Sequence, residues 1–167
     1  MEIVDNFISP EQFQYIQNIM LGPNFTWNYS DGIVGPDDPP GTFQFNHTFY
    51  CAQGVIPCPE KVIQSPWLSI LDPVVKKLGD KIWRIKANMG PRTSEIRRNK
   101  FHIDFPNITT AVYYINTNNG WTEFENGDKV KSVENRIVIF DSQNIHTGTT
   151  CTDEKVRVLI NFNYESY

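Results

Sequence analysis

The sequence predicts a mainly β domain: an antiparallel double sheet, of the sandwich or jelly-roll type, behind an N-terminal helical layer. From residue 81 onward, short alternating β-rich segments follow one another with turn signals between them and no helical pattern. Helical periodicity is confined to residues 9–21 and 65–79. A length of 167 residues suits a single domain, in which residues 1–80 supply a strand, helices and a loop and residues 81–164 the β core.

The chain begins with a short strand and a well-delimited helix. Residues 2–7 are typical of a strand, and residues 9–21 carry one apolar stripe at helical spacing. Ser9 is a good N-cap, and Pro10 fits the first helical position. Gly22 and the proline after it end the helix.

A strand and a second helical segment follow, joined to the first helix through a loop. Residues 42–50 alternate as a strand. Within it His47 lies among phenylalanines and is either a packed, hydrogen-bonded histidine or a metal ligand. Residues 65–79 are helical, and Pro73 either kinks this helix or begins a new turn. The loop at 31–41 is rich in glycine and proline and is either a lid over a site or a plain connection.

The β core is marked by turn signals, of which Asn126-Gly127 is a strong hairpin signal. Its expected strands lie in residues 81–89, 100–105, 109–117, 121–133, 136–141, 145–150 and 156–164.

Composition limits the classes of function. The net charge of -4 argues against a nucleic-acid binder, and the one basic cluster is either a solvated loop or a substrate-recruiting patch (Arg92, Arg97, Arg98, Lys100). Three cysteines without CxxC spacing indicate neither a disulfide framework nor a zinc ribbon. No stretch resembles a signal peptide or a membrane span, so we expect a cytoplasmic protein with no membrane partner.

Three polar side chains form a candidate metal site. In the stretch "FHIDF", His102 and Asp104 lie two residues apart, so a strand would direct both to one face and direct Phe101, Ile103 and Phe105 into a packed layer. A buried aspartate needs a partner or a cation. His146, on a later strand, is a candidate third ligand, and two imidazoles with one carboxylate suit non-haem Fe(II).

The last strand carries a cation in a buried setting. Arg157 lies in "VRVLINFNY", where alternate residues form an apolar face, and no carboxylate is present on the arginine's own face. A buried guanidinium needs a carboxylate or phosphate partner. We therefore expect a ligand carboxylate to pair with Arg157.

Together, the HxD motif at His102 and Asp104, His146 and Arg157 resemble the signature of the Fe(II)/2-oxoglutarate-dependent dioxygenases. The prolyl-4-hydroxylase-like branch, with its small phage and bacterial versions, is the most similar. The resemblance covers roughly residues 81–164. It implies a double-stranded β-helix, iron bound by the two histidines and the aspartate, and 2-oxoglutarate as cosubstrate.

The resemblance also implies roles for further residues. The family binds the far carboxylate of 2-oxoglutarate through a basic residue after the distal histidine, which favours Arg157 and leaves Lys155 as a rival. Tyr114 matches a family tyrosine that binds the same carboxylate, but a core tyrosine is an equal alternative. Asn88 would contact the cosubstrate, and Arg84 or Lys86 the substrate, unless their strand is an exposed edge.

The implied activity is hydroxylation of a C–H bond with O₂, during which 2-oxoglutarate becomes succinate and CO₂. The substrate, a peptide such as a peptidyl proline or a small molecule, is not specified by the sequence. Two alternatives stay open: a cupin-like metal-binding jelly roll without 2-oxoglutarate, and a non-catalytic β module.

Overall fold

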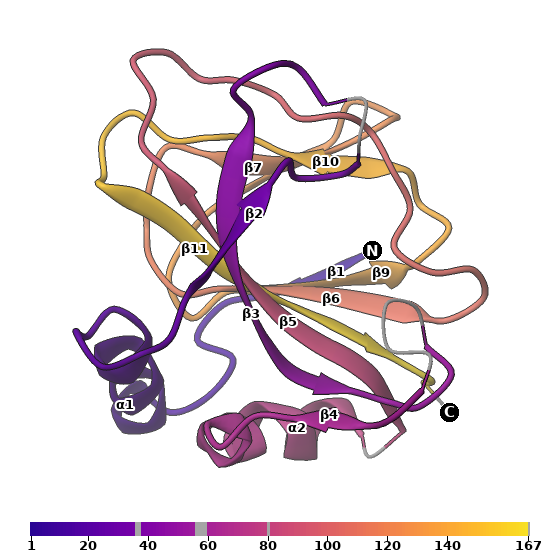
Figure 1. Cartoon of the computed structure of the whole chain (residues 1–167). Coiled ribbons are helices and arrows are strands. Elements are labelled where there is room, and N and C mark those ends of the chain that lie inside the picture. The colour runs from indigo at the N-terminus through magenta and orange to yellow at the C-terminus, as the bar shows by residue number, and fades with distance from the viewer. Residues whose placement is uncertain (36–37, 56–59, 80, 167) are drawn as a thin grey trace.

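Antiparallel strands are the main regular secondary structure of the described chain, which comprises residues 1–35, 38–55, 60–79 and 81–166 of a computed structural model (Figure 1). The elements are β1 (Glu2–Val4), α1 (Pro10–Met20), β2 (Asn28–Asp31), β3 (Phe43–Cys51), β4 (Ile63–Gln64), the 3₁₀ helix η1 (Leu68–Leu71), α2 (Asp72–Leu78), β5 (Ile82–Pro91), β6 (Thr109–Tyr114), β7 (Trp121–Phe124), β8 (Lys129–Lys131), β9 (Ile137–Asp141), β10 (His146–Gly148) and β11 (Val156–Tyr164).

The strands form a large and a small sheet that face each other. The large sheet has the order β1-β9-β6-β11-β5-β3-β2, with β4 paired to β3, and the small sheet has the order β10-β7-β8. Sequence-distant strands are neighbours in the large sheet, as a jelly roll requires. The predicted double-stranded β-helix with an N-terminal helical layer is therefore confirmed, and strands from both halves of the chain enter the large sheet.

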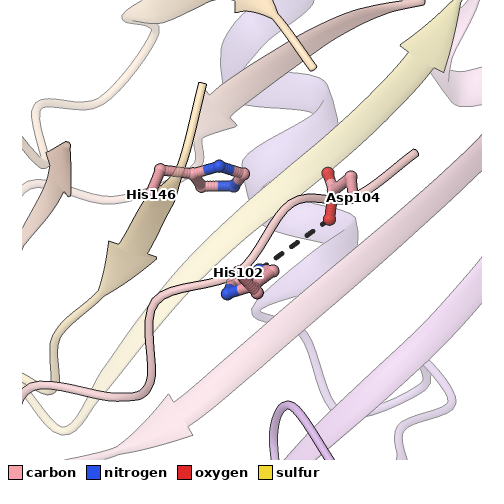
Figure 2. A group of neighbouring side chains, drawn as sticks. All are labelled: His102, Asp104 and His146. Carbon is pink, nitrogen blue, oxygen red and sulfur yellow. Dashed lines mark ion pairs between the residues drawn. The ribbon is translucent and has the colours of Figure 1, made fainter. Parts of the chain in front are cut away.

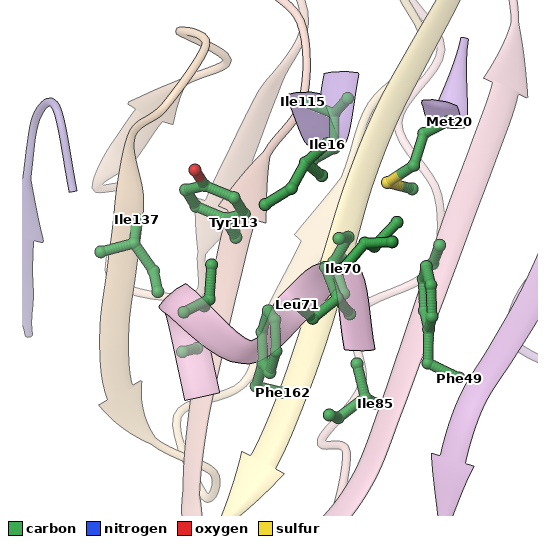
Figure 3. Close-up of a cluster of buried hydrophobic side chains, with 14 of the residues drawn as sticks. Ile16, Met20, Phe49, Ile70, Leu71, Ile85, Tyr113, Ile115, Ile137 and Phe162 are labelled. Atoms are coloured by element: carbon green, nitrogen blue, oxygen red, sulfur yellow. The ribbon is translucent and has the colours of Figure 1, made fainter. Parts of the chain in front are cut away.

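The helices cover the outer face of the large sheet. The Ser9 hydroxyl accepts the Gln12 N–H at 3.3 Å, which caps α1 as predicted. Pro73 lies in the first turn of α2, so it begins a new helix after η1 instead of kinking one. Side chains from α1, η1 and α2 join those of the sheet in one apolar core (Figure 3), including Ile16, Met20, Leu71, Ile85, Tyr113, Ile137 and Phe162.

Strand β11 divides this core from the interior between the sheets. Val158, Ile160 and Phe162 pack toward the helices, as predicted from their alternation. Arg157 and Leu159 face the small sheet, together with the two asparagines that follow at alternate positions. The centre of the large sheet thus presents polar side chains to the space between the sheets.

The segment 100–105 differs from its prediction. It is not a strand, because only His102 forms a β-bridge, an isolated one to His146. Phe101 and Ile103 are 38% and 46% exposed, so the prediction that they pack into a buried layer is wrong. Phe105, the third residue of that prediction, is partly buried and packs against Trp83. Polar and apolar residues can also alternate in an irregular segment. Here the polar residues face the site and the apolar residues Phe101 and Ile103 face solvent.

Matched isoleucine changes test this difference. We expect Ile160→Val to lower the free energy of unfolding by about 0.5–1.5 kcal/mol, because Ile160 is fully buried. Ile103→Val is expected to change it by less than about 0.5 kcal/mol. Urea unfolding of both variants measures the difference, and equal losses would place Ile103 in the core after all.

The cysteines and the helices bear on two expectations from composition. Cys51 is disulfide-bonded, a link that the cysteine count did not predict, whereas Cys151 is a buried free thiol. None of the helices in the described residues combines the length and the hydrophobicity that crossing a bilayer requires.

Candidate metal centre

Three side chains from two segments converge at one end of the space between the sheets (Figure 2). His102 and Asp104 come from the irregular segment before β6, and His146 is the first residue of β10. One ligand atom of each lies within 4.8 Å of the others, and His102 Nε2 is 3.9 Å from Asp104 Oδ1. The geometry thus brings together the three residues predicted to bind metal.

Backbone hydrogen bonds fix the two histidines relative to each other. The His102 N–H donates to the His146 carbonyl at 2.9 Å, and the His146 N–H donates back at 3.0 Å. Each ring uses Nδ1 to contact a backbone carbonyl, that of Lys100 at 3.1 Å and that of Asn144 at 2.9 Å. Because a carbonyl only accepts, Nδ1 carries the proton in both rings, and both Nε2 lone pairs are left for a metal.

His146 is held in a neutral state. It is buried, and its ring packs edge-on against Phe140 with the ring centroids 4.9 Å apart. Burial lowers the pKa of His146, and the nearby Asp104 carboxylate opposes this only in part. A neutral imidazole is the form that binds metal.

Asp104 is held as a carboxylate by neighbours on β5 and β11. Its Oδ1 lies 3.5 Å from Arg84 Nη2, and its Oδ2 accepts the Asn163 Nδ2–H at 3.0 Å. Burial alone would raise the pKa of Asp104, but the Arg84 cation, Asn163 and the two histidines lower it overall. Asn163 also accepts from Arg84 Nε at 3.1 Å, so this asparagine orients both partners.

Asn163 therefore orients Asp104, a predicted metal ligand, without being a predicted ligand itself. We expect Asn163→Ala to weaken metal binding by roughly 10–100-fold, the usual range for partners that orient ligands. Asn161→Ala is the matched control on the same strand, and its affinity for metal in the absence of 2-oxoglutarate is expected to stay unchanged. Titration with Co(II) or Fe(II) measures both, and equal losses would contradict the role of Asn163.

The three clustered side chains open onto a cavity of about 310 Å³. A second cavity of about 270 Å³ adjoins it and shares Ile33, Gln44, Asn88, Asn99, Arg157 and Leu159 with it. Polar and charged side chains of the large sheet form the floor of the first cavity. The described residues that line the first cavity are Ile33, Val34, Gln44, Arg84, Lys86, Asn88, Asn99, His102, Ile103, Asp104, Val112, Thr122, His146, Gly148, Arg157, Leu159 and Asn161.

Arg157 lies in this cavity without a carboxylate partner. It is 6% exposed, and within the described residues it forms no ion pair. Its Nε–H donates to Ser132 Oγ at 2.9 Å, and Nη2 to Thr122 Oγ1 at 3.4 Å. A side chain at Gly120 would meet Arg157 Cδ at 2.7 Å, so this glycine makes room for the guanidinium. A buried cation so fixed fits an anionic ligand.

The other predicted anchors are placed differently. Lys155 is exposed and absent from the cavity lining, which favours Arg157 over it. Tyr114 is fully buried behind Arg157, with the guanidinium carbon 5.8 Å from its ring centroid. Its hydroxyl donates to Thr122 Oγ1 at 2.8 Å, so Tyr114 supports the arginine from below and direct contact with a cosubstrate stays a prediction.

Two asparagines on the cavity floor have unused hydrogen-bonding capacity. Asn88 and Asn161 line the cavity, and neither side chain forms a hydrogen bond within the described residues. Buried polar groups are nearly always satisfied, so these amides fit a bound ligand or water. Sequence reasoning identified Asn88 but missed Asn161, although Asn161 shares the inward face of β11 with Arg157. No pattern in the sequence indicated that Thr122 and Ser132 would contact Arg157.

The loop at 31–41 borders both cavities. Ile33 and Val34 line the first, and Asp38 lines the second. Asp38 Oδ2 accepts backbone N–H groups at 2.6–3.2 Å, from Ile33, Val34 and Gly35, and orders the loop. The described part of the loop therefore forms part of the cavity wall, and whether it acts as a lid stays a prediction; residues 36 and 37 lie outside the described residues.

The remaining candidates have partners of their own. His47 lies on the helix side of β3, where its ring nitrogens contact Thr26 O and Ser65 Oγ, both at 2.8 Å. It is a packed histidine. Arg98 of the basic cluster pairs with Glu123 at 3.2 Å and borders the second cavity.

No protein-family model matches the sequence, and no curated protein sequence matches it. Solved structures resemble the fold over nearly the whole chain. A prolyl hydroxylase from Trichoplax adhaerens, in complex with a hypoxia inducible factor peptide fragment, is 17% identical with a TM-score of 0.58 and covers 98% of this chain and 82% of that chain. The chain shares this fold.

Two other similar structures extend the comparison. An oxidoreductase of the 2OG-Fe(II) oxygenase family from Burkholderia pseudomallei is 8% identical, with a TM-score of 0.67, and covers 98% of this chain and 84% of that chain. HygX from Streptomyces hygroscopicus, with nickel and 2-oxoglutarate bound, is 10% identical, with a TM-score of 0.58, and covers 98% of this chain and 81% of that chain. At these identities the likeness establishes the fold alone.

Proposed function

We propose that the protein is an Fe(II)- and 2-oxoglutarate-dependent oxygenase that hydroxylates a C–H bond of its substrate. One observation carries the proposal: a His-Asp-His cluster opens onto a cavity that also contains a buried arginine without a carboxylate partner. The similar structures named as 2-oxoglutarate oxygenases and prolyl hydroxylases support the same class.

The residues present fit both groups. Two neutral imidazoles and one carboxylate on one side of a metal suit non-haem Fe(II) and leave the other positions open. Arg157 would bind the far carboxylate of 2-oxoglutarate, and Asn88 and Asn161 offer free amides on the cavity floor between it and the metal ligands. With these groups bound, O₂ converts 2-oxoglutarate to succinate and CO₂ and supplies the hydroxyl oxygen.

The chain itself contributes position and charge. Asn163 and Arg84 keep Asp104 ionised and aimed at the metal position. Both histidines present Nε2 because their Nδ1 protons are held by backbone carbonyls. Holding reactants in a fixed, partly water-excluded geometry is the protein's share of such catalysis.

An anaerobic titration tests the proposal. Adding Fe(II) together with 2-oxoglutarate is expected to give a weak visible charge-transfer band, and adding O₂ is expected to yield succinate. A cupin-like protein would bind Fe(II) without responding to 2-oxoglutarate, and a non-catalytic β module would bind neither. Either of those outcomes would replace the proposal with the corresponding alternative.

A further inference from the structure

Lys86, in the middle of β5, is a cation without a partner in the cavity. Its side chain is partly buried and lines the cavity floor. Within the described residues it forms neither a hydrogen bond nor an ion pair. Arg84, the neighbouring cation on the same face, is already engaged by Asp104 and Asn163. Lys86 is thus the cation on this side of the cavity that is free to meet a ligand.

The charges around the cavity leave an excess of positive charge. Of the described residues that line it, Arg84, Lys86 and Arg157 are cationic and Asp104 is the anionic one, and a histidine that binds metal does so in its neutral form. A divalent metal and doubly charged 2-oxoglutarate cancel each other. The loaded cavity therefore still carries two positive charges more than negative ones, in a setting of low dielectric constant.

Lys86 lies away from the residue assigned to 2-oxoglutarate. In the β5–β11 register Lys86 is opposite Asn161, whereas Arg157 is opposite Gly90. Four residues of strand separate the two positions, about 13 Å at about 3.3 Å per residue. On its other side Lys86 pairs with Thr48 of β3, toward the outer part of the cavity floor. One ligand carboxylate at Arg157 leaves Lys86 unpaired.

We propose that the substrate carries an anionic group, a carboxylate or a phosphate, that pairs with Lys86; this inference rests on the proposed oxygenase function. An anion there neutralises a desolvated ammonium and orients the substrate toward the metal position. Burial and the Arg84 cation lower the pKa of Lys86, and the Asp104 carboxylate, which already pairs with Arg84, opposes this only in part. A neutral substrate would leave this charge uncompensated.

The test uses a weakly coordinating anion and its neutral analogue. Mn(II) and 2-oxoglutarate are bound to the protein, and the paramagnetic relaxation of methyl protons is measured for methanesulfonate and for dimethyl sulfone. We expect saturable enhancement for methanesulfonate alone. Lys86→Met should weaken its apparent binding at least about tenfold, whereas Lys86→Arg and the exposed control Lys131→Met should retain it.

The outcomes separate this inference from the proposed function. Equal enhancement for both probes, or enhancement that survives in Lys86→Met, would overturn the inference while 2-oxoglutarate binding still supports the oxygenase. Weaker 2-oxoglutarate binding in Lys86→Met would assign Lys86 to the cosubstrate and also overturn it. Failure of the wild type to bind 2-oxoglutarate would overturn both. Repeating the measurement with acetate and with methylphosphonate distinguishes a carboxylate substrate from a phosphate.

Discussion

Replacing Asp104 with alanine is expected to abolish the charge-transfer band of the protein with Fe(II) and 2-oxoglutarate. Asp104 is the one carboxylate in the described ligand cluster, and two imidazoles alone leave a cationic metal without charge compensation. We expect metal affinity to fall by more than about 100-fold, beyond the range seen for partners that only orient ligands. Anaerobic titration followed by visible absorption measures the loss.

Two further variants separate this effect from unfolding. Asp104→Asn keeps the shape that Asn163 contacts but removes the charge, so it should fold and still lose the band. Asp31→Ala, on the edge strand β2, removes an exposed carboxylate and should bind metal normally. A band that persists in either Asp104 variant, with an intact melting transition, would remove Asp104 from the metal site.

The sequence predicted which three side chains would cluster, because few residues of the chain can bind metal. The chain has three histidines, and His47 lies among phenylalanines on the helix side of β3. The i and i+2 spacing of His102 and Asp104 directs both side chains inward even though their segment is irregular. Both side chains keep this direction because the β-bridge between His102 and His146 fixes the backbone of the segment at that point.

What the sequence could not predict depends on strands that pair over long separations. Asn163 follows His102 by many residues, and nothing local shows that β11 passes beneath the aspartate. The exposure of Phe101 and Ile103 has the same origin, since it depends on what packs against that segment from elsewhere in the chain. Local alternation reports which residues share a face, but tertiary packing decides what that face meets.

Replacing Arg157 with alanine is expected to weaken 2-oxoglutarate binding at least about 30-fold and to leave metal affinity unchanged. Truncating one partner of a buried charge pair costs about 2–5 kcal/mol. Arg157 is buried and fixed by Ser132 and Thr122, so it meets the ligand without reorganisation. Titration of the metal-loaded variant with 2-oxoglutarate measures the change.

Lys155 supplies the matched control, because it lies two residues earlier on the chain and is exposed. Lys155→Ala should bind 2-oxoglutarate as the wild type does. Arg157→Lys retains the charge but loses the planar fork that contacts Ser132 and Thr122 together, so its affinity should fall between those of the wild type and Arg157→Ala. Loss of affinity in Lys155→Ala, with normal binding in Arg157→Ala, would transfer the anchoring role to the lysine. It would also leave the buried guanidinium in need of another anion, since within the described residues no carboxylate pairs with it.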